Sequence, residues 1–228
     1  MLRVSAETIE GPRPSDLFDV FSDAAGDLVV VLLDVRCMSD ASTSFLGSLM
    51  RGLRAALEEH EPLHLVVNEL EMQLAARPGI EAGAIILRIS QRDARVELLN
   101  AGMPPLARAL PGGELDVHPP LSNPVGRRVG EVHPYEVVPL VWGSTWLALS
   151  DGMTAGSLDA APVRELCEKL ELEAKGMELA AMTREGIYDV LQAVMPGARF
   201  SRDDATCVFV AADAHGQGGR FKSGIESH

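Results

Sequence analysis

The chain has 228 residues, 46% of them hydrophobic and 23% charged, a composition typical of a globular protein with a full core. Its 33 acidic and 20 basic residues give a net charge of −13, which argues against a nucleic-acid partner because phosphate binding requires a basic face. No apolar run approaches the length of a membrane span, and the three widely spaced cysteines show no zinc pattern, so we expect a cytoplasmic protein with no membrane partner.

The first part of the chain is predicted to form strands followed by two helices. A turn containing Gly26 leads into a continuous apolar run, which is typical of a buried strand. Leucines at helical spacing then predict one helix, and Pro62 separates it from a second. The predicted elements are strands at 2–9, in a short run ending at 21 and at 28–33, and helices at 45–57 and 63–74.

The middle of the chain is rich in predicted strands, and two further helices and a strand follow. Short polar loops between apolar runs are typical of hairpins, and we expect 141–144 to be one of them. Because helices and strands do not alternate as in a parallel sheet, their order predicts an α+β fold with antiparallel sheets and helices packed outside. The predicted elements are strands at 84–89, 95–99, 106–110, 114–118, 136–140 and 145–149, helices at 162–172 and 177–194, and a strand at 205–211.

Three acidic motifs lie beside apolar runs that are predicted strands. Asp34 follows the run at 28–33, Asp151 follows the run at 145–149, and Asp203 precedes the last strand. Carboxylates beside a core are costly unless a cation compensates them, so three that converge from strand ends would form a site for a hard cation. A single aspartate at a strand end more often forms a turn or caps a helix, so the metal interpretation depends on the three together.

Six segments occur along the chain in an order known from one protein family. The segments are Ser15-Asp16-Leu17-Phe18-Asp19, Leu33-Asp34-Val35, Asn100-Ala101-Gly102-Met103-Pro104-Pro105, Asn123-Pro124-Val125-Gly126, Trp142 to Thr154, and Asp203-Asp204-Ala205-Thr206. They resemble the motifs of metal-dependent protein serine/threonine phosphatases of the type 2C superfamily. The resemblance is greatest to the bacterial branch that includes the stage II sporulation E phosphatase and stress-response regulators of sigma-factor pathways.

The resemblance implies both a fold and an activity. The implied fold is a sandwich of two antiparallel β-sheets flanked by α-helices on both sides, in four layers, within a single domain of residues 1–212. Residues 213–228, rich in Gly, Ser and charge, are expected to form a flexible tail. The implied activity is hydrolysis of phosphoserine or phosphothreonine on a bacterial signalling protein, such as an anti-anti-sigma factor, by a hydroxide bound to two Mn²⁺ or Mg²⁺ ions.

The resemblance also assigns metal ligands by position. Asp34 would bridge both ions, and the backbone carbonyl of Val35 would bind one of them. Asp151 and Asp203 would complete the principal site, and Asp16 is the expected fourth carboxylate. Two arginines beside these ligands could contact a phosphate, although a surface position is the commoner explanation for an arginine. They are Arg36 and Arg202.

The chain departs from the family pattern around Asp34. The family usually reads Gly-Asp-Val-x-Gly-(His or Lys)-Gly, whereas Leu33, Cys37 and Ser39 stand at the glycine positions here. Met103 stands where the family commonly has His, while Gly152 is kept and is expected to allow a sharp turn beside Asp151.

These departures leave alternatives open. The chain could be an active but divergent phosphatase, or a pseudophosphatase that retains the fold for protein binding with weak metal affinity. A third interpretation is an acidic protein stabilised by metal, with no phosphate chemistry.

Overall fold

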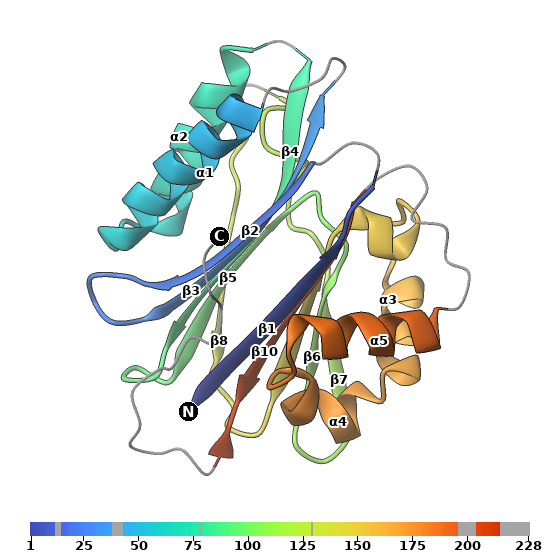
Figure 1. Cartoon of the computed structure of the whole chain (residues 1–228). Helices are drawn as coiled ribbons and strands as arrows, with labels where there is room; N and C mark the ends of the chain where they lie inside the picture. Colours follow the sequence, from blue (N-terminus) through green and yellow to red (C-terminus); the bar gives the residue numbers. More distant parts are fainter. Residues whose placement is uncertain (12–14, 38–42, 78, 129, 196–203, 215–228) are drawn as a thin grey trace. The chain divides into compact units, whose positions relative to one another are not determined.

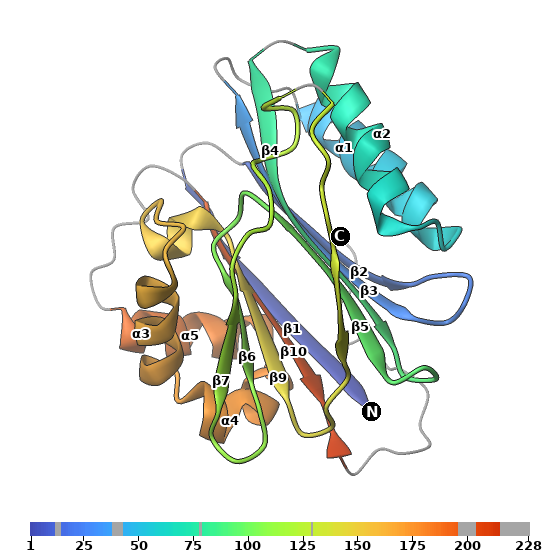
Figure 2. The same cartoon turned by 180° about the vertical axis from the view of Figure 1, so that it is seen from behind.

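The computed structural model describes residues 1–11, 15–37, 43–77, 79–128, 130–195 and 204–214. The chain forms two compact units, each with one five-stranded antiparallel sheet and its own helices (Figure 1 and Figure 2). The first unit comprises Met1–Pro14, Pro104–Pro119 and Val141–His228, and the second comprises Ser15–Met103 and Pro120–Leu140.

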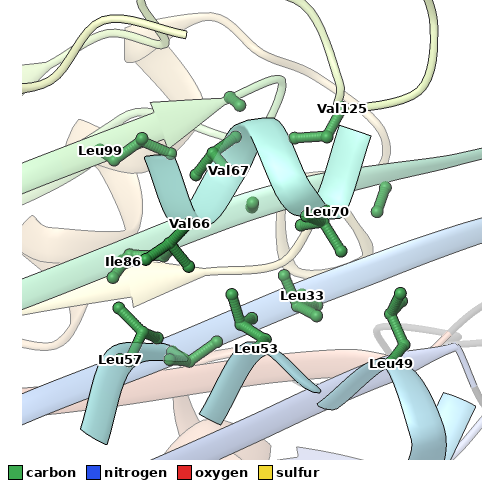
Figure 3. Close-up of a cluster of buried hydrophobic side chains, with 14 of the residues drawn as sticks. Leu33, Leu49, Leu53, Leu57, Val66, Val67, Leu70, Ile86, Leu99 and Val125 are labelled. Atoms are coloured by element: carbon green, nitrogen blue, oxygen red, sulfur yellow. The ribbon is translucent and has the colours of Figure 1, made fainter. Parts of the chain in front are cut away.

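The sheet of the second unit has the strand order β2-β3-β4-β5-β8 and carries two helices on one face. Leu33 of β3 packs there among leucines of α1 and apolar residues of α2 (Figure 3). Because side chains alternate along a strand, Asp34 lies on the opposite face of this sheet. The elements are β2 (Asp16–Ser22), β3 (Leu28–Cys37), α1 (Thr43–Glu58), α2 (Leu63–Ala75), β4 (Ile80–Ser90), β5 (Arg95–Ala101) and β8 (Glu136–Pro139).

The sheet of the first unit has the strand order β1-β10-β9-β6-β7, and three helices cover one of its faces. The strands β9 and β10 are buried along their whole length, which explains their nearly uninterrupted apolar sequences. The elements are β1 (Leu2–Ile9), β6 (Leu106–Ala109), β7 (Leu115–His118), β9 (Thr145–Leu149), the short 3₁₀ helix η1 (Asp151–Thr154), α3 (Ala160–Lys169), α4 (Leu172–Leu179), α5 (Arg184–Val194) and β10 (Ala205–Ala212).

The predicted α+β class, with two antiparallel sheets and helices packed on them, is confirmed. Two element predictions are wrong. The segment 141–144 is not a hairpin, because β8 pairs with β5 whereas β9 pairs with β10 and β6. The helix predicted at 177–194 is interrupted after Leu179, and α5 begins anew with Thr183 as its cap, whose hydroxyl accepts a hydrogen bond from the Gly186 N–H at 3.3 Å.

The strand β3 is longer than predicted, and this changes the position of Asp34. Its ladder with β4 continues through Arg36 opposite Glu81 to Cys37 opposite Ile80. Asp34 therefore lies inside a strand, not at its end, because no glycine interrupts the extended backbone after Leu33. Among the described residues, no helix is both long and apolar enough to cross a membrane.

Candidate metal centre

Two of the predicted ligands are direct neighbours across β2 and β3. Asp16 and Asp34 are paired in the register of this antiparallel ladder, so both side chains lie on the face opposite the helices. Directly opposite residues have Cβ atoms about 4.5–5.5 Å apart, and like charges in such a pair destabilise the sheet unless a cation joins them. Asp34 is fully buried whereas Asp16 is half-buried, so the desolvation cost is greater for Asp34.

The backbone of Val35 is oriented toward the same edge of the sheet. Its N–H donates a hydrogen bond to the Ser15 carbonyl at 3.1 Å. In an antiparallel ladder the N–H and C=O of one residue point toward the same neighbouring strand. The Val35 carbonyl therefore points toward the segment that contains Ser15 and Asp16, and its role as an oxygen ligand stays a prediction.

Arg36 lies on the same face as Asp34 and binds its carboxylate. Its Nε and Nη2 atoms donate to Asp34 Oδ2 at 3.1 and 2.9 Å. Its Nη1 atom is also 3.9 Å from Oε1 of Glu81, the residue opposite it on β4. The predicted phosphate contact thus has a carboxylate partner in this structure.

The side chain of Met103 explains why a glycine, Gly83, lies beside Asp34 on β4. The residue opposite Asp34 on β4 is Gly83, and a Cβ atom there would lie 2.4 Å from the Met103 sulfur. Met103 is fully buried, so its side chain covers the sheet where Gly83 leaves room. A thioether is a soft ligand that Mn²⁺ and Mg²⁺ do not prefer, so Met103 packs against Gly83 and is not a metal ligand.

Asp151 and Gly152 begin η1 in the first unit. The Asp151 carbonyl accepts hydrogen bonds from the Gly156 N–H at 2.8 Å and the Thr154 hydroxyl at 3.2 Å. A Cβ atom at Gly152 would lie only 1.9 Å from the carbonyl oxygen of Asp204. The backbone turns here from β9 into η1, but Gly152 has no positive φ, so the turn does not depend on a conformation that favours glycine. The glycine is required because the chain passes directly against the start of β10.

The remaining predicted residues divide into those the structure describes and those it does not. Asp203 and Arg202 lie outside the described residues. Asp204 is 2% exposed, and its Oδ1 accepts the Gly11 N–H at 2.7 Å. Its described role is to hold the segment that follows β1.

The donors at Asp34 fit a hard divalent cation. The carboxylates of Asp16 and Asp34 and the carbonyl of Val35 are oxygen ligands, which Mn²⁺ and Mg²⁺ prefer. The buried carboxylate of Asp34 requires a positive partner, and in this structure a guanidinium fills that role.

A second acidic cluster, which the sequence did not reveal, lies at the turn between β2 and β3. Ligand atoms of Asp23, Asp27 and His60 lie within 4.8 Å of one another. Asp23 Oδ2 is 2.6 Å from His60 Nδ1 and 3.3 Å from Nε of Arg88, a buried guanidinium that would repel a cation. Asp23 Oδ1 also accepts the Ala25 and Asp27 N–H groups at 3.0 Å.

This cluster therefore closes the turn and ties it to β4. His60 follows the end of α1 and pairs with Asp23. The available sequence signal was Arg88, because a charge inside an apolar strand requires a buried partner.

The chain matches one protein-family model. The model described as stage II sporulation protein E (SpoIIE) matches residues 24–213. No curated protein sequence matches the chain significantly.

Several solved structures resemble the chain in fold at low sequence identity. The RsbU and RsbW domains of a Mycobacterium tuberculosis protein match with a TM-score of 0.71 and 17% identity, covering 93% of this chain and 60% of that one. This chain thus spans less than two thirds of that structure. The catalytic domain of the serine/threonine phosphatase PstP in complex with two manganese ions matches with a TM-score of 0.65, 17% identity, and coverage of 93% and 98%. RsbX in complex with magnesium matches with a TM-score of 0.61, 14% identity, and coverage of 92% and 94%.

Proposed function

Because this chain belongs to the stage II sporulation protein E family of type 2C-like serine phosphatases, we propose that it hydrolyses phosphoserine or phosphothreonine on a bacterial signalling protein. The observation that best supports this is the pairing of Asp16 with Asp34 across β2 and β3. Two adjacent carboxylates, one of them fully buried, are unfavourable unless a cation lies between or beside them.

We assign the following roles to the residues of this chain. Asp34 and Asp16 would hold the ions through their carboxylates, and Val35 would hold them through its backbone carbonyl. By the family pattern, Asp151 and Asp203 are further ligands. Two Mn²⁺ or Mg²⁺ ions, when bound, would lower the pKa of water and neutralise charge on the phosphoryl oxygens.

Arg36 and Arg202 are the proposed contacts for the phosphate group of the substrate. A guanidinium presents its donors in a fork that matches phosphate oxygens, which an ammonium does not. The proposed partner is a phosphorylated regulator such as an anti-anti-sigma factor, and the proposed setting is the cytoplasm.

The direct test is hydrolysis of p-nitrophenyl phosphate and of a phosphoserine peptide with and without Mn²⁺. We expect activity only with the metal, and a loss of about 10²-fold or more in Asp151→Asn, because removing a charged ligand weakens the activation of water. The matched control is Asp159→Asn, which removes an exposed carboxylate of the same unit just before α3 and should leave the rate unchanged.

Two results would contradict the proposal. One is hydrolysis that does not depend on metal, and the other is an Asp151→Asn protein as active as the unchanged chain. A peptide carrying phosphotyrosine serves as a specificity control and should be hydrolysed far more slowly than the phosphoserine peptide.

A pseudophosphatase that regulates a partner by binding is the second candidate. It is favoured by the loss of glycine at Leu33 and by the pairing of Arg36 with Asp34. Calorimetric titration with Mn²⁺ separates the two functions, because binding of two ions at micromolar concentration would exclude this alternative.

A further inference from the structure

We propose that Arg36 competes with the metal for Asp34, because its guanidinium binds the Asp34 carboxylate and must leave before an ion can bind there. This inference rests on the proposed function, because it concerns the same carboxylate. It adds a residue that sets the metal requirement of this chain.

The strand geometry of β3 places Arg36 beside Asp34 on the same face of the sheet. Residues two apart in a strand lie on the same face, so the Asp-Val-Arg spacing places the guanidinium beside the carboxylate. Two N–H groups of Arg36 converge on one oxygen, Oδ2 of Asp34, at 3.1 and 2.9 Å. Charge-assisted bonds of this kind are among the strongest in proteins, so an incoming ion must displace a favourable partner.

The charges around this pair explain why a cation is required. Asp16 is opposite Asp34 on β2, and Glu81 is opposite Arg36 on β4, so one face of the sheet carries three carboxylates. Arg36 is the guanidinium bound to Asp34, while Arg127 reaches Glu81 at 3.9 Å. A divalent ion would compensate the same carboxylates with one more positive charge than Arg36 supplies.

Arg36 is also placed so that it can leave. Its side chain is 30% exposed, so it can turn into water at little desolvation cost. Arg88, the guanidinium that compensates Asp23, is 3% exposed and also donates to the Glu61 carbonyl at 2.7 Å. Arg88 is therefore held in a buried ion pair with Asp23, whereas Arg36 can leave its ion pair with Asp34 for solvent.

The test is calorimetric titration of the full chain with MnCl₂ after removal of metal with EDTA. We expect Arg36→Gln to bind Mn²⁺ at least tenfold more tightly than the unchanged chain. The matched control is Arg127→Gln, which removes a guanidinium beside the same Glu81 but does not reach Asp34, and its affinity should change less than twofold. In EDTA, Arg36→Gln should unfold at a lower temperature than Arg127→Gln, and Mn²⁺ should abolish that difference.

A conservative variant gives a second measurement. Arg36→Lys keeps the charge but loses the forked donors, so its affinity for Mn²⁺ should lie between those of the unchanged chain and Arg36→Gln. In the Asp34→Asn background, replacing Arg36 by Gln should no longer increase affinity, because the contested carboxylate is gone.

The outcomes separate this inference from the proposed function. If the unchanged chain and the Arg36 variants bind Mn²⁺ with equal affinity, the competition does not exist, although a metal-dependent phosphatase still stands. Weaker binding by Arg36→Gln would also overturn the inference, because Arg36 would then support the metal. If no form of the chain binds Mn²⁺ at millimolar concentration, both the inference and the proposed metal centre are refuted.

Discussion

The segments around Asp34 and Asp151 each carry a proposed aspartate ligand, but packing acts differently on the glycine position beside each one. Beside Asp151, the glycine of the family pattern is kept, and the carbonyl oxygen of Asp204 occupies the space that a side chain would need. Beside Asp34, the family's glycine is replaced by Leu33, which packs in the core under α1 and α2. Packing therefore requires the glycine after Asp151, whereas packing favours a leucine at the glycine position before Asp34.

The largest effect is expected from restoring the family's glycine at position 33. Leu33→Gly should lower the free energy of unfolding by about 4 kcal/mol, because it leaves a cavity in the core and adds backbone entropy to a strand. Urea unfolding in EDTA measures this loss, and Leu33→Ala isolates the part due to the cavity. A Leu33→Gly chain as stable as the parent would show that Leu33 has no packing role.

A somewhat smaller loss of stability is expected at Gly152, the glycine that matches the family pattern in the other segment. Gly152→Ala should cost about 3 kcal/mol, because its Cβ atom would lie 1.9 Å from the Asp204 carbonyl oxygen and the backbone must move. The control is Gly186→Ala in α5, whose Cβ atom would meet its nearest neighbour at 3.5 Å and should be neutral or slightly stabilising. Equal effects of the two substitutions would remove the proposed packing constraint at Gly152.

The smallest effect concerns Cys207, which lies on β10 three residues after Asp204. Burial raises the pKa of its thiol from 9.0 to about 12. The folded chain therefore keeps the proton at pH values where the unfolded chain loses it, and the contribution to stability is complete below pH 9 and declines as pH rises toward 12. At pH 10.5 the loss from this thiol should be about 2 kcal/mol relative to pH 8.

Urea unfolding at these two pH values, in the parent and in Cys207→Ala, measures that contribution. The decline with pH should be smaller in the variant, since the thiol that titrates differently in the two states is gone. An identical decline in both proteins would show that Cys207 ionises in the folded chain as readily as in the unfolded one.

Much of the fold was predictable because local patterns report burial directly. Apolar runs such as 28–33 and leucines at helical spacing reported strands and helices, and polar loops reported most turns. The sequence could not predict the crossing at 141–144, because two adjacent apolar runs look the same whether they pair with each other or with distant strands. The break before α5 was also missed, since Thr183 is an N-cap only when the chain turns there.

The candidate site was predictable as a set of residues but not as an arrangement. The carboxylates were identified by their positions beside apolar runs and by the order of the family motifs. Asp16 and Asp34 lie opposite each other only in the observed strand register. A shift of one residue would place their side chains on opposite faces of the sheet. The Asp23, His60 and Arg88 cluster joins three elements distant in sequence, so the chemistry of each residue alone did not reveal it.

The sequence by itself determined the family, the antiparallel α+β class and the presence of acidic residues suited to a hard cation. Only the tertiary structure decided that Gly152 is required by a neighbouring carbonyl and that Arg36 is bound to Asp34. The physical reason is that residue chemistry and periodicity are local properties, whereas close approach and charge pairing depend on which distant segments meet and in which register.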